Sequence, residues 1–505
     1  MRRRTFLGLI LAGPAVAAVG LPVVTVASAR PRPVSATVRQ LPLSGVAVPP
    51  GAGLRRPGTR LLHLSAPTAT APFSLVGVTW EPDRGLELDV QVRTRSAGRW
   101  SPWQVLPPQG EHRPDRGPDT VAGLREGTAP VWVGASDGVQ VRVDALSAAR
   151  PRDIRIQLVD PGSSPGDTPT TAPRAAAHAD QGQPEIITRA QWGADESIRR
   201  GNPSFNTTVR VGFVHHTASS NNYTAAQAAA MVRGIYAYHV KSNGWSDIGY
   251  NYLVDRFGRA YEGRFGGLDR HVVGAHTGGF NANSFAVSLL GDFSSVPASD
   301  QTLATVATML AWKLGSAYRD PQAKAELTSA GGGTSRFSAG TKVSFNVVSG
   351  HRDAGNTSCP GSTVYSRLAS IRAAVQSDLG AGFADPVVNQ TAFALGSTGP
   401  LTLTARALVG TVWTVTVLNA LGQELRSAKG TTPAINFSWD LTTPAGTPVP
   451  PGNYAVRLTG ANEVDTALTY AVQVVIDTPI CRGAPIQRAV CRTQERTARA
   501  PRPSP

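Results

Sequence analysis

The spacing of apolar residues changes twice along this 505-residue chain, and the change limits the folds open to it. Near the N-terminus, the runs 86–92, 139–143 and 154–158 alternate apolar and polar residues, which is typical of strands with one buried face. The same alternation returns at 413–417 and 454–458. Between these regions apolar residues recur at helical spacing. We therefore predict an α/β region between two all-β regions.

The central region has three stretches of helical periodicity. Thr224 is placed to cap a helix that runs to about Lys241, and a second helix begins near Ser299. A third runs from about Thr363 to Leu379. Apolar strand candidates lie between and around them, at 209–215, 250–254, 285–290 and 345–350. This alternation predicts a mixed central sheet with flanking helices, and a glycine-rich stretch at 321–341 has the composition of a flexible insertion.

A chain of this length exceeds what one compact core usually holds, so we expect several domains. The predicted segments are a leader (1–29), an N-terminal β-sandwich (35–160), a linker (161–184), the α/β domain (185–380), an immunoglobulin-like sandwich (382–477) and a basic disordered tail (478–505). Four tryptophans of the first sandwich can line a sugar-binding surface or fill its core, and we favour the core. They are Trp80, Trp100, Trp103 and Trp132.

The first 29 residues resemble an export signal. Arg2-Arg3-Arg4-Thr5-Phe6-Leu7 opens an uncharged stretch that ends at the small residues Ala27-Ser28-Ala29. Paired arginines before Phe-Leu are typical of the twin-arginine route, which predicts a secreted or cell-wall protein. An ordinary signal peptide or an uncleaved anchor are the alternatives. Further along, the sequence has no stretch of membrane-spanning character, so we expect no transmembrane segment in the mature chain.

The formal net charge of +15 favours polyanionic surroundings. Part of it lies in Arg2, Arg3 and Arg4, and part in the tail, which has six arginines against one glutamate. The sequence shows no nucleic-acid-binding motif, and the leader indicates export. The anionic cell envelope is therefore the expected environment, and we expect no nucleic-acid partner.

The three cysteines divide into two groups. Cys481 and Cys491 lie in the tail, where they are able to close a small disulfide loop in an exported protein. Cys359 is then left single. Either it is a buried, inert residue, or it binds a metal.

A metal is favoured by two histidines that the predicted sheet brings near this cysteine. His215 and His351 each end a predicted strand, and Cys359 follows His351 by eight residues. Ligands gather at the carboxyl ends of strands in open α/β sheets. Two imidazoles and a thiolate suit zinc and leave its fourth position open, as in catalytic sites. Six of the nine histidines fall in this one region.

Several separated blocks of residues in this region resemble the peptidoglycan recognition protein family, which overlaps the zinc-dependent N-acetylmuramoyl-L-alanine amidases of bacteria and phages. The blocks are Ile187-Thr188-Arg189-Ala190-Gln191-Trp192-Gly193-Ala194, Phe213-Val214-His215-His216-Thr217, Trp245-Ser246-Asp247-Ile248-Gly249-Tyr250-Asn251-Tyr252, Tyr261-Glu262-Gly263-Arg264, Gly274-Ala275-His276-Thr277, and Gly350-His351-Arg352-Asp353 through Cys359-Pro360. The resemblance covers roughly residues 186–380. More weakly, 395–460 resembles the immunoglobulin-like part of flagellar hook-capping proteins.

The resemblance implies a role for each matching position. The zinc ligands fall on His215, His351 and Cys359, and the catalytic tyrosine falls on Tyr250. Thr357 stands where phage relatives carry lysine, and we expect it to be a second catalytic residue, which holds the water or the oxyanion. His276 and Asn281 match positions that line the substrate groove, and Trp245 is placed to flank it. Members that only recognise peptidoglycan typically lack the cysteine ligand, which this chain keeps.

Two further histidines of the region are predicted to lie apart from the metal. The strand that holds His215 would turn the next side chain, His216, to its opposite face. His239 lies on a predicted helix, where we expect it to be exposed.

The function predicted from these observations is a secreted zinc amidase. Its substrate would be the glycan strand of peptidoglycan with its stem peptide, and it would cut the amide between N-acetylmuramic acid and L-alanine. The alternatives are a peptidoglycan-binding protein that does not cut and an envelope-anchored structural protein. The sequence leaves open the stem-peptide preference, the proton donor to the leaving amine and the oligomeric state.

Overall fold

The computed structural model describes residues 33–43, 58–82, 86–108, 114–115, 123–147, 150–164, 167, 182–332, 335–397, 399–462 and 468–477. The leader (1–29), most of the predicted linker and the tail with Cys481 and Cys491 lie outside these residues. The predictions for them stay predictions. Among the helices of the described residues, none has the length and apolar character needed to cross a membrane.

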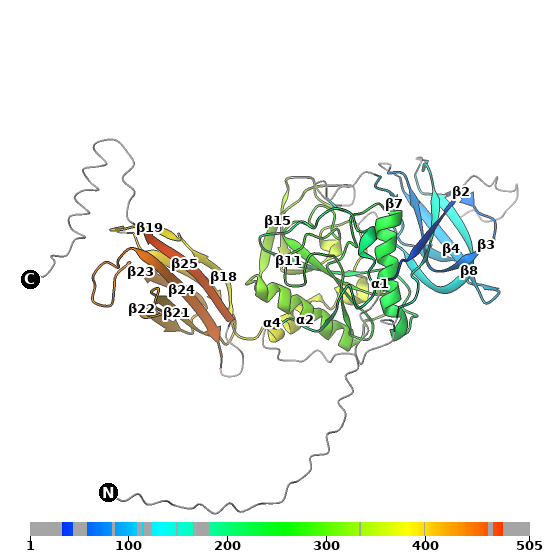
Figure 1. Ribbon diagram of the computed structural model, residues 1–505. Helices are drawn as coiled ribbons and strands as arrows, with labels where there is room; N and C mark the ends of the chain where they lie inside the picture. The colour runs from blue at the N-terminus through cyan, green and yellow to red at the C-terminus, as the bar shows by residue number, and fades with distance from the viewer. Residues whose placement is uncertain are drawn as a thin grey trace, which may run out of the picture. The chain divides into compact units, whose positions relative to one another are not determined.

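The N-terminal part is an antiparallel sheet of nine strands (blue to cyan in Figure 1). The strands are β1 (Thr37–Pro42), β2 (Arg60–Leu64), β3 (Thr68–Trp80), β4 (Leu88–Ser96), β5 (Arg99–Trp100), β6 (Gln104–Leu106), β7 (Glu126–Gly127), β8 (Val131–Ala145) and β9 (Arg155–Asp160). The predicted alternating runs fall in β4, β8 and β9. All nine strands belong to one hydrogen-bonded sheet, because the long strands β3 and β8 each pair with three others.

The four tryptophans of this sheet divide between core and surface. Trp80 and Trp132 are buried, as the core interpretation predicts. Trp103 is 37% exposed. The guanidinium carbon of Arg93 lies 5.2 Å from the ring centroids of both Trp100 and Trp103. The core interpretation therefore holds for Trp80, which packs in the core of this sheet, whereas Trp132 packs against residues of the central region.

A mixed six-stranded sheet lies at the centre of the described chain, as predicted. Its order is β10-β13-β12-β14-β11-β17. The strands are β10 (Ile186–Ile187), β11 (Val211–His216), β12 (Tyr252–Val254), β13 (Ala260–Glu262), β14 (Ser284–Leu289) and β17 (Val348–Gly350). Strand β11 runs parallel to both of its neighbours, β14 and β17, so the carboxyl ends of all three lie at one edge.

Helices cover both faces of this sheet because its strands are apolar on both sides. Phe285, Val287 and Leu289 of β14 pack in one core with α2 (Asp300–Ser316) and α4 (Leu368–Leu379). Ala286, between them, packs in a second core with α1 (Ala228–Ala237). Successive side chains of β14 point to opposite faces of the sheet, so α2 and α4 cover one face and α1 covers the other (Figure 1).

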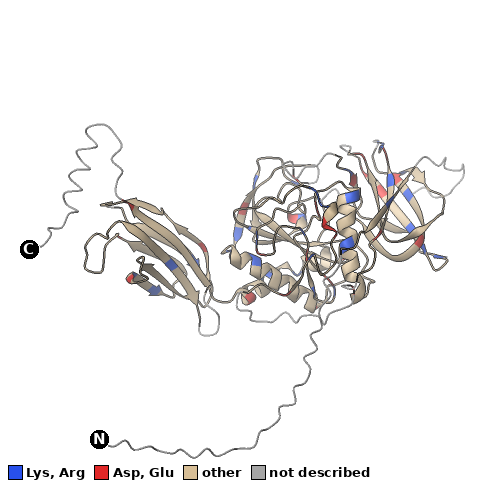
Figure 2. Cartoon of the chain, in the orientation of Figure 1, with Lys and Arg blue, Asp and Glu red and all other residues tan. Residues whose placement is uncertain are grey.

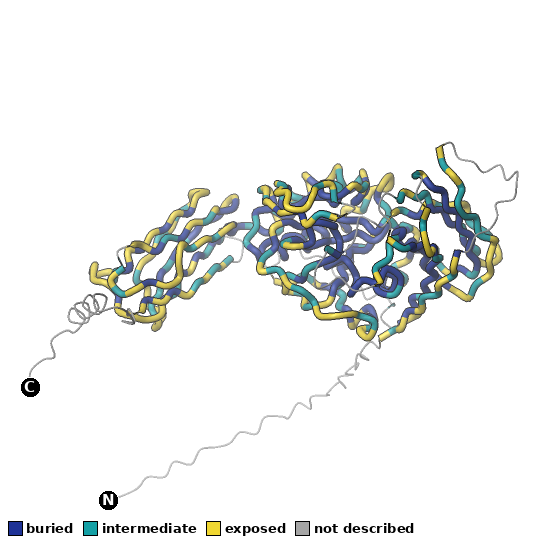
Figure 3. The backbone as a smooth tube through the Cα atoms, turned by 90° about the horizontal axis from the view of Figure 1, so that it is seen from above, coloured by how far each residue is buried: buried dark blue, intermediate teal, exposed yellow. Residues whose placement is uncertain are grey.

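Helix α1 is buried on every side, although its sequence predicts one apolar face. All ten of its residues are buried. Its core also contains Leu75, Trp132 and Val159 of the N-terminal sheet, which covers the side that the central sheet leaves free. The 3-10 turn η3 (Ala225–Gln227) precedes α1, and the π-helical segment η4 (Tyr238–Ser242) follows it. Figure 3 colours the backbone by burial and shows buried segments, in dark blue, gathered in the interior of the central part.

Hydrogen bonds reinforce this shared core. The Tyr238 hydroxyl donates to the Thr128 carbonyl at 2.9 Å. The backbone N–H of Trp132 donates to the Ser219 hydroxyl at 2.7 Å. Arg233 of α1 binds the Asp167 carboxylate with both terminal nitrogens, at 2.6 and 2.7 Å. The start of the predicted linker is thus fixed to α1 where it is described.

Two predictions for the central region need correction. The third helix is broken into α3 (Ser362–Tyr365) and α4, and residues 366–367 form a turn between them. Helix α4 ends at Leu379, as predicted. The expected flexible insertion instead contributes strand β15 (Lys324–Thr328), which pairs with β16 (Lys342–Asn346). Leu327 and Phe345 anchor this hairpin in a small apolar cluster with residues of β11.

The C-terminal part is a sandwich of two sheets, as predicted. One sheet has three strands, in the order β18-β20-β23, and the other has five, in the order β19-β25-β24-β21-β22. The strands are β18 (Phe383–Val388), β19 (Ala392–Ala394), β20 (Leu401–Ala407), β21 (Val412–Leu418), β22 (Glu424–Gly430), β23 (Ala434–Trp439), β24 (Gly452–Ala461) and β25 (Leu468–Asp477). Figure 2 shows basic and acidic residues interspersed along the described chain.

Candidate metal centre and groove

His215 and His351 are brought together by the parallel pairing of two strands. Val214 of β11 is paired with Gly350 of β17, so the next residue of each strand is a histidine at the same sheet edge. The two imidazole centroids lie 4.6 Å apart, and both side chains are fully buried. His351 begins the 3-10 turn η5 (His351–Asp353) rather than ending the strand, which is one residue from the predicted position.

Cys359 reaches the histidines from the loop that follows η5. Its sulfur lies 3.7 Å from His215 Nδ1 and accepts a hydrogen bond from the His216 backbone N–H at 3.3 Å. The loop turns at Gly361, where φ is +87° and a Cβ would lie 2.3 Å from the Phe293 backbone. Only glycine fits there without displacing the neighbouring chain.

The three predicted ligands form a compact donor set. The ligand atoms of His215, His351 and Cys359 all lie within 4.8 Å of one another. Two imidazole nitrogens and one thiol sulfur match the donor preference of zinc, and three protein ligands leave one of its four positions open. The residues therefore fit the metal that the family implies.

Thr277 orients His215, a role that the sequence did not reveal. His215 Nε2 lies 3.2 Å from the Thr277 hydroxyl oxygen, which lies 2.9 Å from His276 Nδ1. In the tautomer that leaves the Nδ1 lone pair for a metal, Nε2 carries the proton and donates a hydrogen bond to the Thr277 hydroxyl. The Thr277 hydroxyl can then donate to His276. Such partners fix the tautomer and ring orientation of a metal ligand.

His216 faces away from the donor set, as predicted. Its Nδ1 accepts a hydrogen bond from the Phe293 N–H at 3.2 Å, on the opposite side of β11. Burial lowers the pKa of His216 to about 4, and the nearby Asp292 opposes this shift. The side chain is therefore neutral at pH 7.

Tyr250 lies beside His215, with ring centroids 5.8 Å apart. His239 lies near Tyr250 and is buried, with 1% of its surface exposed, so the prediction that it is exposed was wrong. His239 lies in the π-helical segment η4, stacks on Trp245 with centroids 4.3 Å apart, and accepts a hydrogen bond from the Gly249 N–H through Nδ1. A helical residue was expected to face solvent, but the shared core surrounds this end of the helix.

The other predicted site residues have local structural partners. Asn281 Oδ1 accepts hydrogen bonds from the N–H groups of His276 and Thr277, so it shapes the turn 276–281. The Thr357 hydroxyl accepts from the Cys359 N–H at 2.9 Å and thereby supports the loop that presents the sulfur.

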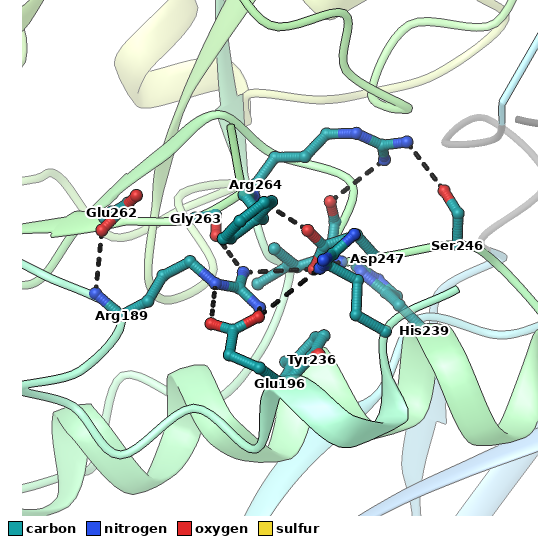
Figure 4. A network of polar contacts seen from close by, with 12 residues as sticks. Arg189, Glu196, Tyr236, His239, Ser246, Asp247, Glu262, Gly263 and Arg264 are labelled. Carbon is teal, nitrogen blue, oxygen red and sulfur yellow. Dashed lines mark hydrogen bonds and ion pairs between the residues drawn. The ribbon is translucent and has the colours of Figure 1, made fainter. Parts of the chain in front are cut away.

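A buried ionic network supports the loop that carries Trp245 and Tyr250 (Figure 4). Arg189 Nη1 binds the Asp247 carboxylate at 3.1 Å, and Arg189 Nε binds the Glu196 carboxylate at 2.7 Å. Asp247 also accepts from the backbone N–H groups of Ile248 and Phe265. Burial alone would lower the pKa of Arg189, but Asp247 and Glu196 raise it above its ordinary value.

Comparison with known families is consistent with this geometry. Residues 205–362 match the family model described as N-acetylmuramoyl-L-alanine amidase. Residues 27–179 match an Rv3811 N-terminal galactose-binding domain-like model, and residues 389–463 match a FlgD Ig-like domain model.

Individual relatives match the same central region. Peptidoglycan-recognition protein SC2 of Drosophila melanogaster is 31% identical over 184 residues, which cover 36% of this chain and 84% of that protein. The N-acetylmuramoyl-L-alanine amidase of Homo sapiens is 31% identical over 193 residues, covering 37% of this chain and 28% of that protein. The solved structure of Drosophila PGRP-LB aligns at 23% identity over 37% of this chain and 93% of its own, with a TM-score of 0.29. Because the match spans most of the length of the recognition protein, this chain belongs to the peptidoglycan recognition protein and type 2 N-acetylmuramoyl-L-alanine amidase family.

Proposed function

We propose that the chain is a secreted zinc-dependent N-acetylmuramoyl-L-alanine amidase, which hydrolyses the amide between N-acetylmuramic acid and L-alanine in peptidoglycan. The observation that carries the proposal is the convergence of His215, His351 and Cys359, whose ligand atoms lie within 4.8 Å of one another. A binding protein has no need of a buried thiol in such a set. Export through the twin-arginine route is part of the proposal and rests on the leader sequence.

In this proposal each residue has a stated task. His215, His351 and Cys359 would hold the zinc, and Thr277 would keep His215 in the tautomer that offers Nδ1. When bound, zinc lowers the pKa of a water and polarises the scissile carbonyl. Tyr250 would donate its hydroxyl proton in a hydrogen bond to the carbonyl oxygen as charge develops there, an interaction typically worth about 3–4 kcal/mol.

The groove would be formed by the turn 276–281 and the loop that carries Trp245. Thr357 would act on the loop of the thiolate rather than on the substrate, since its hydroxyl oxygen accepts from the Cys359 N–H. The N–H of His276 is held by Asn281, which would keep the imidazole beside the metal ligands.

The test is product analysis with purified peptidoglycan. We expect new L-alanine amino termini to appear without new reducing sugar ends. Reducing ends alone would show that a glycosidic bond is cut and would contradict the proposal. A Tyr250→Phe variant should release fewer termini by a factor of about 10²–10³ while it keeps its zinc.

Recognition without cleavage remains the competing function, because relatives of the same family carry recognition names. Binding of insoluble peptidoglycan by the wild-type chain, with no new L-alanine termini at any zinc concentration, would favour it. A Cys359→Ser variant that binds peptidoglycan as the wild type does but releases no termini would favour the amidase.

A further inference from the structure

The turn 276–281 holds a carboxylate that comes from the N-terminal part of the chain. The Gly279 N–H donates to one oxygen of Asp115 at 2.6 Å, and the Asn281 N–H donates to the other at 3.1 Å. The Asn281 side chain already satisfies the N–H groups of His276 and Thr277, so the turn directs a second pair of N–H groups toward Asp115. Two backbone donors on the two oxygens of one carboxylate form a charge-assisted pair, as in anion-binding backbone nests.

This amide pair lies at the edge of the candidate metal centre. The same turn carries His276, whose ring centroid is 5.3 Å from that of the ligand His215. A group bound to Gly279 and Asn281 is therefore next to the groove that the proposed function requires. Asp115 is not part of the α/β sequence blocks that resemble the family, so the chain supplies this carboxylate from another module.

Arg125, further along the N-terminal part, contacts the other loop that would line the proposed groove. The Arg125 N–H donates to the Asn243 carbonyl at 3.0 Å, two residues before Trp245. The two walls are joined where the Ala275 N–H donates to the Gly249 carbonyl at 2.9 Å. Asp115 and Arg125 thus contact the two loops that hold the predicted substrate residues His276 and Trp245.

We propose that the backbone N–H groups of Gly279 and Asn281 form a carboxylate-binding subsite at the groove rim, which Asp115 fills until a carboxylate of the substrate displaces it. The inference rests on the proposed function for the identity of the substrate, since stem peptides carry free carboxylates close to the lactyl amide. Asp115 is then an internal competitor that lowers the affinity of the groove for its ligand. If Asp115 fills the subsite nine-tenths of the time, the apparent dissociation constant rises about tenfold.

The test measures binding of a soluble ligand to the full chain by calorimetry. The probes are N-acetylmuramyl-L-alanyl-D-glutamate and its bis-amide, in which both carboxylates are carboxamides. All proteins carry Cys359→Ser so that no ligand is consumed. Asp115→Ala and Asp115→Asn are compared with the parent, and Asp137→Ala is the matched control, because Asp137 pairs with Arg95 in the N-terminal sheet.

We expect Asp115→Ala to bind the acid about tenfold more tightly than the parent and to gain much less for the bis-amide. Asp115→Asn should gain less than the alanine variant, because its amide oxygen still accepts one hydrogen bond. Asp137→Ala should match the parent for both probes. In hydrogen exchange without ligand, the amides of Gly279 and Asn281 should exchange faster in Asp115→Ala.

Equal affinity of the parent and Asp115→Ala for the acid would overturn the proposal. So would an equal gain for acid and bis-amide, which would mean that Asp115 blocks the groove by bulk alone, or a failure of every protein to bind the acid. The outcome is separable from that of the proposed function. A gain in affinity in the Cys359→Ser background, with no L-alanine termini released by the chain that keeps Cys359, leaves the subsite and removes the amidase. Turnover by the chain that keeps Cys359, without any gain in affinity in the Cys359→Ser background, does the reverse.

Discussion

At the scale of single residues, the neighbours of the proposed metal ligands hold them in place. His215 is fixed by a strand, by the sulfur of Cys359 on one side of its ring and by the hydroxyl of Thr277 on the other. The Thr277 hydroxyl oxygen in turn lies 2.9 Å from His276 Nδ1. Outer partners of this kind set the basicity and orientation of a ligand, so a residue that never touches the metal should still control its affinity.

Replacing Thr277 by valine tests this role. The change keeps the shape of the side chain but removes the hydroxyl that accepts from His215 Nε2, so zinc affinity should fall by about 10- to 100-fold. Competition with a chelating dye measures the affinity. Thr277→Ser, which retains the hydroxyl, should stay close to the wild type, and an unchanged affinity in the valine variant would refute the role.

His271 makes a separate contribution to acid sensitivity. Burial and then the charges of Lys313 and Arg319 lower its pKa from 6.5 to about 4. Between pH 6.5 and 4 the unfolded state therefore binds more protons than the folded state, and stability falls as pH falls through this window. The loss of thermal midpoint from pH 7 to pH 4.5 should be smaller in His271→Asn than in the wild type. Equal losses of thermal midpoint in His271→Asn and the wild type would show that His271 does not contribute to acid sensitivity.

At the scale of elements, long periodic segments were predictable and short or irregular ones were not. The alternation in β4, β8 and β9 and the stripe of α2 are strong signals because each repeats over several residues. Strands β10 and β13 have two and three residues, too few to show a period. The β15–β16 hairpin was hidden because Leu327 and Phe345 stand among glycine, serine and lysine, so its small apolar cluster is visible only in three dimensions.

The buried network around Arg189 makes a prediction for the loop that carries Tyr250. The Arg189 and Asp247 side chains are 4% and 5% exposed, so Arg189→Met leaves a buried charge without its partner. We expect a loss of about 3–5 kcal/mol in the free energy of unfolding of the central part.

Arg95→Met is the matched control for that measurement, because it breaks the exposed pair with Asp137 and should cost less than about 1 kcal/mol. Chemical denaturation of both variants gives the comparison. Similar losses in the two would mean that Asp247 is held by its backbone partners and not by Arg189.

At the scale of the whole molecule, the N-terminal sheet and the central α/β part share one core. Helix α1 packs on both, which explains why all ten of its residues are buried. The convergence of His215, His351 and Cys359 was predictable because strand order and motif agree on it. The Asp115 contact was not, because nothing in the sequence relates this residue to the turn 276–281.

Removal of residues 33–164 should therefore destabilise the central part rather than simply open its groove. The change would expose the side of α1 that packs on Leu75 and Trp132, and we expect a lower thermal midpoint and aggregation. Removal of 389–477 is the control, since these strands contribute no residue to the candidate centre. A monomeric N-terminal truncation with an unchanged midpoint would show that the shared core is dispensable.

The central claim is that His215, His351 and Cys359 bind the zinc on which hydrolysis depends. Its most direct test is a zinc titration of the chelated full chain, with bound metal and released L-alanine termini measured on the same samples. We predict that activity returns in proportion to bound zinc and is complete at one ion per chain, and that Cys359→Ser recovers neither. Full turnover by the metal-free chain, or activity that is independent of Cys359, would contradict the account.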